Sequence, residues 1–123
     1  QNAIYRSNIV LVMIDAVKGF NKQDKTIIDD TISKTKGLII VVNKWDLIKK
    51  NNDSMQNFIN EMRYQFKSID HYPIIFISAL TKQRIHKVLE VSWDVYNRII
   101  HKLSTKKLRC DEETSFFYLY FIL

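Results

Sequence analysis

Three short apolar runs constrain the fold of this chain more than any other feature of its sequence. They occupy residues 9–14, 38–42 and 74–77, are rich in Ile and Val, and contain almost no polar interruption. A strand with one exposed face alternates apolar and polar residues, whereas a strand buried on both faces reads as a continuous apolar run. The three runs therefore predict strands of a parallel sheet that is covered on both faces.

Helical patterns separate these runs. A first helix is expected after Asn21, a good capping residue, with Asp24 in its first turn and Gly37 as the left-handed residue that ends it. A second helix, capped by Asp53 or Ser54, has apolar residues at three- and four-residue spacings. Its apolar stripe consists of Met55, Phe58, Ile59, Met62, Phe66 and Ile69.

A third helix is predicted over residues 84–103. Its apolar stripe consists of Ile85, Val88, Leu89, Trp93, Tyr96, Ile99, Ile100 and Leu103. Strands that alternate with helices and are joined by right-handed crossovers form a parallel α/β layer. We therefore expect three parallel strands, with the first two helices on one face of the sheet and the 84–103 helix on the other.

The composition excludes several classes of protein. With 123 residues, 46% of them hydrophobic, the chain can bury one small core. The lone cysteine, Cys110, excludes a disulfide framework and a cysteine metal site, as is typical of a reducing compartment. The sequence has no signal-peptide pattern and no apolar run long enough to cross a membrane, so we expect a cytoplasmic location and no membrane partner.

The basic charge is concentrated in one segment. The formal net charge is +6, and residues 82–109 hold eight basic and two acidic side chains, while the rest of the chain is balanced. Two interpretations stay open for this segment, a solvated helix face or a surface that contacts phosphate groups or RNA.

Glycine scarcity excludes two kinds of nucleotide-binding loop. Gly19 and Gly37 are the only glycines, whereas a phosphate loop of the form GxxxxGK[ST] needs two glycines five residues apart and a dinucleotide fingerprint needs three. Ser78 has no flanking glycines that would make it the nucleophile of a hydrolase elbow. The histidines show no metal-ligand spacing; they are His71, His86 and His101.

Polar residues follow each predicted strand. Asp15 follows the first strand, the sequence NKWD at 43–46 follows the second, and SAL at 78–80 follows the third. Ligands of parallel sheets bind beyond the carboxyl ends of the strands. The sequence therefore predicts a binding site at this edge of the sheet, although polar residues can also simply end a strand and start a loop.

NKWD matches N-K-x-D, the guanine-specificity motif of P-loop GTPases. The Asp46 carboxylate can accept hydrogen bonds from the N1–H and the amine of guanine, which adenine does not offer, and each such bond contributes roughly 1.5–3 kcal/mol. Lys44 can lay its methylene stem on the base, and Asn43 can bond the base and fix the neighbouring loops. SAL is similar to a second base-binding motif of these proteins, in which backbone N–H groups near Ser78 and Ala79 point at guanine O6.

Longer segments carry a more specific resemblance. The segments AIYRSNIVLVMIDAVKGFNKQDKTI at 3–27, GLIIVVNKWDLIKK at 37–50 and PIIFISALTKQRIHKV at 73–88 resemble the second GTPase domain of the bacterial Der (EngA) family. The resemblance extends to about residue 108. It implies the fold of a P-loop GTPase domain, GTP or GDP as ligand, and a role in maturation of the large ribosomal subunit with ribosomal RNA as partner. It assigns base binding to Asn43, Lys44, Asp46, Ser78, Ala79 and Leu80.

The sequence also departs from that family. The phosphate loop, the switch threonine and the D-x-x-G motif are absent, and with them the Mg²⁺ ligands that the complete family member provides. We therefore expect a partial domain over residues 1–103 that lacks its first half, leaves its first strand as a bare edge, and has no catalytic residue of hydrolysis. Residues 104–123 are expected to form a linker toward a missing KH-like domain and an aberrant aromatic tail, which could also be a strand. The alternatives are a non-catalytic ribosomal RNA-interaction module that uses residues 82–109, or a decayed gene product without activity.

Overall fold

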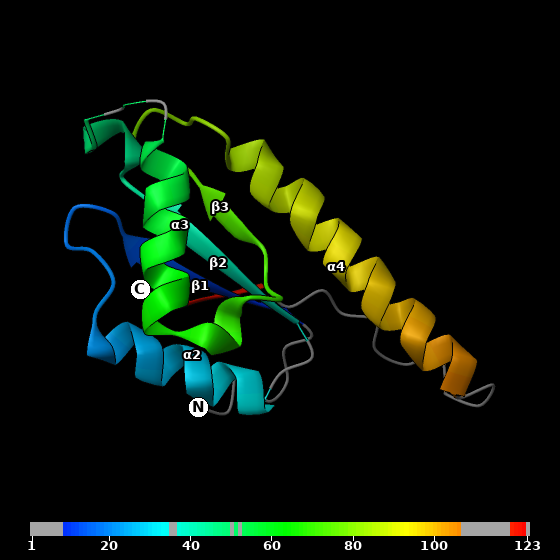
Figure 1. Ribbon diagram of the computed structural model, residues 1–123. Helices are drawn as coiled ribbons and strands as arrows, with labels where there is room; N and C mark the ends of the chain where they lie inside the picture. Colours follow the sequence, from blue (N-terminus) through cyan, green and yellow to red (C-terminus); the bar gives the residue numbers. More distant parts are fainter. Residues whose placement is uncertain (1–8, 35–36, 50, 52, 107–118, 123) are drawn as a thin grey trace.

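The structure, a computed structural model, describes residues 9–34, 37–49, 51, 53–106 and 119–122, with only the backbone of 101–106 and 119–122. Strands and helices alternate along most of the chain (Figure 1). The strands are β1 (Ile9–Asp15), β2 (Gly37–Asn43), β3 (Ile74–Phe76) and β4 (Leu119–Ile122), the α-helices are α2 (Lys22–Lys34), α3 (Ser54–Gln65) and α4 (Ile85–Lys106), and two short 3-10 helices are η1 (Trp45–Leu47) and η2 (Lys67–Ile69).

The strands form one parallel sheet in the order β3-β2-β1-β4. The three parallel strands that the apolar runs predict are confirmed, with β2 starting one residue earlier and β3 ending one residue earlier than the runs. In β1 and β2 the register pairs Ile9 with Gly37 and, at the other end, Asp15 with Asn43. The carboxyl ends of these two strands therefore lie level with each other.

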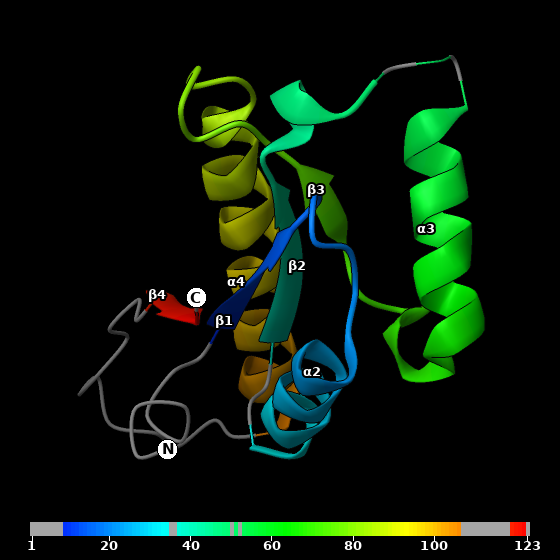
Figure 2. The same ribbon diagram turned by 90° about the vertical axis from the view of Figure 1, so that its left-hand side faces the viewer.

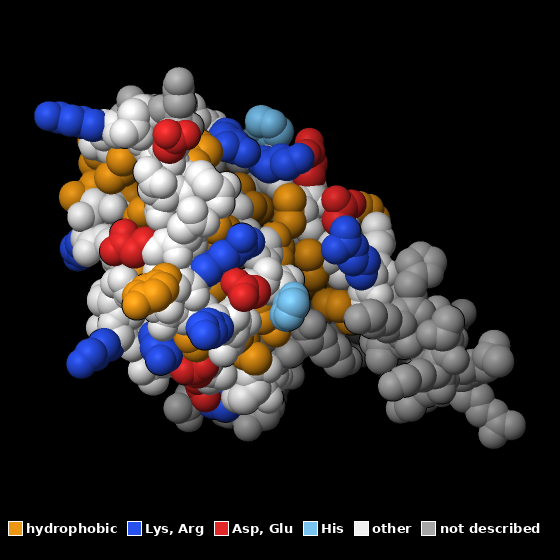
Figure 3. All heavy atoms as spheres, in the orientation of Figure 1, with side chains coloured by type: hydrophobic (Ala, Val, Ile, Leu, Met, Phe, Trp, Pro, Cys, Tyr) orange, Lys and Arg blue, Asp and Glu red, His pale blue; other side chains and the backbone are white. Residues whose placement is uncertain are grey.

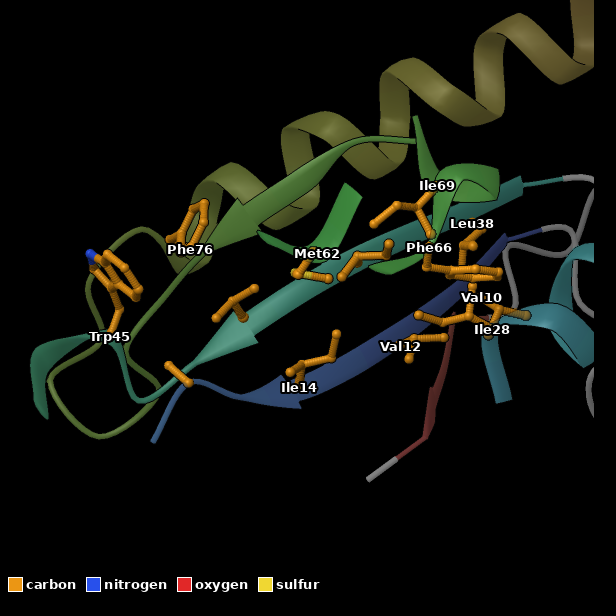
Figure 4. Packing of buried hydrophobic residues seen from close by; sticks show 13 residues of the cluster. Val10, Val12, Ile14, Ile28, Leu38, Trp45, Met62, Phe66, Ile69 and Phe76 are labelled. Atoms are coloured by element: carbon orange, nitrogen blue, oxygen red, sulfur yellow. The ribbon is translucent and has the colours of Figure 1, made fainter. Parts of the chain in front are cut away.

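Each face of the sheet has its own apolar core, because consecutive side chains of a strand point to opposite faces. One core joins β1 and β2 to α2 and α3 through residues such as Val12, Ile28 and Met62 (Figure 4). The other core joins the same strands to α4 through residues such as Leu11, Val88 and Tyr96. The predicted layers are thus confirmed, with α2 and α3 on one face and α4 on the other (Figure 2).

The helix α2 begins as its sequence predicts. Asn21 Oδ1 accepts a hydrogen bond from the Asp24 amide at 3.0 Å, and Asp24 Oδ2 accepts one from the Asn21 amide at 3.1 Å. This reciprocal capping box satisfies two amides at the helix start. The expected role of Gly37 is wrong, since it is the first residue of β2. The described glycine with positive φ is Gly19 (φ 75°), in the turn after β1.

The helix α3 is shorter than its apolar stripe. It ends at Gln65. The last two stripe residues are still buried, Phe66 as the C-cap residue of α3 and Ile69 as the last residue of η2. Its N-cap residue is Asp53, whose side chain makes no capping bond; Ser54 Oγ instead accepts a hydrogen bond from the Asn51 amide at 2.9 Å. The apolar spacing therefore predicted the position of the helix correctly. The helix nevertheless ends before the last two residues of the stripe.

The strand β4 changes the expected edge of the sheet. It pairs in parallel with β1, from Ile9 opposite Leu119 to Val12 opposite Ile122. The strand β1 is therefore an interior strand rather than the bare edge that the sequence suggests. A strand buried on both faces has no water for its amides and carbonyls, so a second neighbouring strand satisfies groups that would otherwise be unpaired.

In the described part of the chain, none of the helices has the length and apolar character that a membrane span requires.

The pairing of β4 can be tested with two neighbouring proline substitutions. In a parallel ladder, successive residues direct their N–H groups to opposite sides, and proline has no N–H to donate. We therefore expect only one of Tyr120→Pro and Phe121→Pro to lower the melting temperature clearly, while the other serves as its matched control. Thermal melts followed by circular dichroism measure the difference; equal and negligible effects of both substitutions would contradict the pairing.

Candidate functional site

Backbone hydrogen bonds tie together the loops at the carboxyl ends of β1, β2 and β3. The Ala16 amide donates to the Asn43 carbonyl at 3.0 Å, and the Trp45 amide donates to the Ile77 carbonyl at 3.1 Å. These bonds continue the pairing of the sheet beyond the strands themselves. The structure therefore brings the NKWD and SAL segments together at one edge, as the order of motifs along the chain predicts.

Asn43 links the two motif loops through one side-chain oxygen. Its Oδ1 accepts hydrogen bonds from the Lys44 amide at 2.8 Å and from the Ala79 amide at 3.0 Å. An amide oxygen has two acceptor sites, so both are used. The side chain can therefore offer a ligand the two N–H groups of Nδ2.

Asp46 is held by the buried hydroxyl of Ser78. Ser78 Oγ donates to Asp46 Oδ1 at 2.6 Å, and the same Oγ accepts a hydrogen bond from the Thr81 amide at 3.3 Å. Ser78 is only 1% exposed, so this hydroxyl is part of the scaffold rather than of the surface. The bond orients the Asp46 carboxylate and uses one of its roughly four acceptor sites, so both oxygens can still accept hydrogen bonds from a ligand.

The buried ring of Trp45 attaches the NKWD loop to the apolar core. Its ring is 5% exposed and lies 4.5 Å from the ring of Phe76 and 5.9 Å from that of Phe58, measured between centroids. Aromatic pairs at such distances stabilise by about 0.5–1.5 kcal/mol beyond the burial of their surface. The sequence does not assign this residue a role, although an aromatic side chain between polar neighbours after a buried strand is a usable signal for such an anchor.

Lys44 and Asp15 form an ion pair across the ends of β2 and β1. Lys44 Nζ lies 2.8 Å from Asp15 Oδ2, while Asp15 Oδ1 accepts hydrogen bonds from the Val17 amide at 2.9 Å and the Lys18 amide at 3.3 Å. The hydrogen bond from Lys44 and the bonds from the two amides hold the pKa of the Asp15 carboxyl below its ordinary value. The sequence places Asp15 at a strand end but does not reveal this partner.

The backbone of the SAL loop differs from the expectation. The Ser78 amide donates to the Gln83 carbonyl at 3.2 Å, and the Gln83 amide donates back to the Ser78 carbonyl at 3.1 Å. Because the Ala79 amide is also engaged, by Asn43, neither amide points freely outward as the sequence suggests. Leu80, at the tip of this loop, is 86% exposed.

A hollow of about 220 Å³ lies beside the motif loops and is lined by Asp15, Lys18, Asn21 and their neighbours, but by no residue of either motif. Within the described ranges, no group of three or more His, Cys, Asp or Glu residues could hold a metal ion. A ligand of the motif residues would lie across the carboxyl ends of β1, β2 and β3.

The chain has a parallel sheet with helices on both faces, and the NKWD and SAL loops follow two neighbouring strands. This combination is typical of the class of GTP-binding α/β domains. The family model described as the elongation factor Tu GTP binding domain matches residues 1–98. The chain therefore belongs to the elongation factor Tu GTP binding domain family.

Its relatives within that family are similar over most of this chain. GTPase Der of Alkaliphilus oremlandii is 42% identical over 106 residues, which are 86% of this chain and 24% of the relative. GTPase Der of Streptococcus pneumoniae is 48% identical over 89 residues, which are 72% of this chain and 20% of the relative. The resemblance to the Der family is confirmed, and the chain spans a fifth to a quarter of the length of these relatives.

Solved structures of Era have the same fold. A variant of Aquifex aeolicus Era bound to GDP·AlF4⁻ superposes with a TM-score of 0.61 and 26% sequence identity, covering 72% of this chain and 29% of that one. Era in complex with MgGDPNP and nucleotides 1506–1542 of 16S ribosomal RNA has the same TM-score and identity, covering 72% of this chain and 28% of that one. The expected fold of a partial P-loop GTPase domain is thus confirmed.

Backbone strain next to the site gives a prediction for Lys82. Lys82 (φ 59°) adopts the left-handed conformation, which costs residues with a Cβ roughly 1–2 kcal/mol. We expect Lys82→Gly to raise the free energy of unfolding by about 0.5–1 kcal/mol, because relief of this strain exceeds the extra chain entropy of glycine. Lys82→Ala removes the same charge but keeps the Cβ, so its melting temperature should stay near that of the parent. Urea unfolding measures both variants, and an equal gain in both would contradict the prediction.

Proposed function

We propose that this chain is the guanine-recognition part of a Der-like GTPase that acts in biogenesis of the large ribosomal subunit. The observation that carries the proposal is the Asp46 carboxylate, which the Ser78 hydroxyl holds by one oxygen at 2.6 Å. Its remaining acceptor sites, on both oxygens, are left for a ligand at the carboxyl edge of the sheet. Residues 1–103 would form the C-terminal part of the GTPase domain, and residues 104–123 would comprise a linker toward a KH-like domain and the aromatic tail, of which residues 119–122 pair with β1 as β4.

Asp46 supplies selectivity between the purines. Guanine carries an N1–H and an exocyclic amine on one edge, and both can donate to a carboxylate in the plane of the base. Adenine has an unprotonated N1 at that edge, so its complex would leave the carboxylate facing an acceptor. A buried polar group without a partner costs about 1–3 kcal/mol, which is the origin of the discrimination.

Asn43 and Ala79 suit the opposite edge of the base. Guanine presents N7 and O6 there, and both are acceptors. Because Asn43 Oδ1 already accepts two amides, its Nδ2 is the group that can donate to N7. The Ala79 amide can donate to O6 as well as to Asn43 through a shared, three-centre hydrogen bond. Leu80 lies beside these groups at the exposed tip of the loop.

Lys44 would support one face of the base with its methylene stem. Its side chain is 51% exposed, and its ammonium lies at Asp15 on the neighbouring strand. The stem therefore runs along the strand ends, where its apolar surface can contact a flat aromatic ring. The same placement keeps the charged end away from the ring.

The phosphates of GTP or GDP would find few partners within this sequence. It contains no GxxxxGK[ST] loop, and the loop and helix start that hold phosphates contribute strongly to nucleotide affinity. We expect the base contacts alone to give a dissociation constant no tighter than about 1 mM, which corresponds to ~4 kcal/mol. Mg²⁺ would accompany the phosphates in a complete family member, and no described residue of this chain is assigned to it.

A second candidate function is contact with ribosomal RNA through the basic segment 82–109. Lys82, Arg84, Lys87 and Arg98 are all exposed along the loop before α4 and on α4 itself. Figure 3 shows basic side chains beside hydrophobic and acidic ones on this side of the molecule. The related Era is bound to 16S ribosomal RNA in one solved structure, which favours this candidate. Filter binding of ribosomal RNA that is unaffected by guanine nucleotide would support it.

The proposed base site can be tested by NMR with two nucleotides. Titration of the ¹⁵N-labelled chain with GMP should shift the amides of Asn43, Lys44, Asp46 and Ala79, whereas AMP should leave them nearly unchanged. Amides of α2 distant from the site provide an internal control. Equal shifts with both nucleotides, or shifts spread over the whole spectrum, would contradict guanine recognition.

Substitution of Asp46 tests the origin of the selectivity. Asp46→Asn replaces one acceptor oxygen with a donor amide, so guanine meets one repulsive contact, whereas xanthine offers a carbonyl in place of the amine. We expect GMP binding to become undetectable, because a cost of roughly 2–4 kcal/mol removes most of the ~4 kcal/mol available from the base contacts, and xanthosine monophosphate to become the preferred ligand. Asp70→Asn, on an exposed carboxylate outside the site, is the control. If the Asp46→Asn chain still prefers GMP, Asp46 does not recognise the base.

A further inference from the structure

Asp15 lies at the site without a role in the proposed base contacts. It ends β1, level with Asn43 in the register of the sheet, and its side chain is 22% exposed. Both of its carboxylate oxygens are engaged, Oδ1 by the Val17 and Lys18 amides and Oδ2 by the Lys44 ammonium. The two amide bonds fix the orientation of the carboxylate, so that Oδ2 is presented toward β2.

We infer that Asp15 is a positioning residue that holds the Lys44 side chain across the strand ends, in the place where its methylene stem supports guanine. This inference rests on the proposed function. It assigns to Asp15 no contact with the base or with any reacting atom. Its action passes entirely through the 2.8 Å ion pair with Lys44.

The geometry fixes the lysine at both ends. At its backbone, Lys44 is in the left-handed conformation (φ 61°) and donates its amide to Asn43 Oδ1, which sets the direction of its Cα–Cβ bond. At its other end, the ammonium is held by Asp15. A free lysine side chain samples many rotamers and would lose that freedom when a base stacks on it. Fixing the stem beforehand removes this cost from binding, which is the general advantage of preorganisation.

The exposure of the pair argues against a mainly structural role. Ion pairs between exposed side chains contribute little to folding, because solvent and salt screen them. The side chains of Lys44 and Asp15 are 51% and 22% exposed, so solvent reaches the pair. Loss of the Asp15 charge alone should therefore change ligand affinity while leaving the melting temperature close to that of the parent chain.

A double-mutant cycle in the full chain tests the inference, with GMP as the probe. Asp15→Asn keeps an oxygen for the Val17 and Lys18 amides and removes the negative charge that faces Lys44, while Lys44→Met keeps an apolar stem and removes the ammonium. We expect Asp15→Asn to weaken GMP binding by about three- to tenfold, and we expect it to have no further effect in the Lys44→Met background. Asp30→Asn, which removes another exposed carboxylate paired with a lysine, should leave GMP binding unchanged.

A second readout follows the position of the stem directly. Stacking on guanine should move the methylene proton signals of Lys44 upfield through the ring current, and this shift at saturation should be smaller in Asp15→Asn. GMP affinity and Lys44 shifts equal to those of the parent chain and of Asp30→Asn would overturn the inference. In that case the preference for GMP over AMP would persist, so the proposed function would stand. Absence of that preference in the parent chain would overturn both.

Discussion

The parallel pairing of β1 and β2, with both faces buried, is the constraint on which the rest of the structure depends. Side chains of these strands such as Val10, Leu11, Ile39 and Ile40 are almost completely buried, because helices cover the sheet on both sides. Burial leaves the backbone groups of these strands no partner except the neighbouring strand. The register is therefore fixed along the full length of the pair, and it places the polar ends of β1 and β2 side by side.

The polar edge of the sheet is held together by side chains that bond to backbone. Asn43 connects the loop after β2 to the loop after β3, and Ser78 connects the same loops through Asp46. Trp45 fixes the loop to the core between these two polar contacts. Asn43 and Asp46 each use part of their hydrogen-bonding capacity within the protein and keep the remainder for a ligand.

The relation to GTPase Der and Era describes the sheet and its loops, and the chain spans a fifth to a quarter of the length of the Der relatives. One feature of the sheet depends on residues near the end of this chain, since β4 lies beside β1. The N–H and C=O groups along the side of β1 that does not face β2 can form hydrogen bonds with an extended segment from elsewhere in the chain. The aromatic and aliphatic residues 119–122 provide such a segment through their backbone, whatever the amphipathic pattern of their side chains.

The sequence by itself determined the class of fold, the number of core strands between helices, and the two motifs at successive strand ends. These follow from local patterns, since burial, helix period and capping chemistry act over a few residues. Only the tertiary structure decided that Asp15 pairs with Lys44, that Asn43 accepts a hydrogen bond from the Ala79 amide, and that β4 lies beside β1. Those contacts join residues from 29 to more than 100 positions apart, and which distant groups meet is set by the register and packing of the whole sheet.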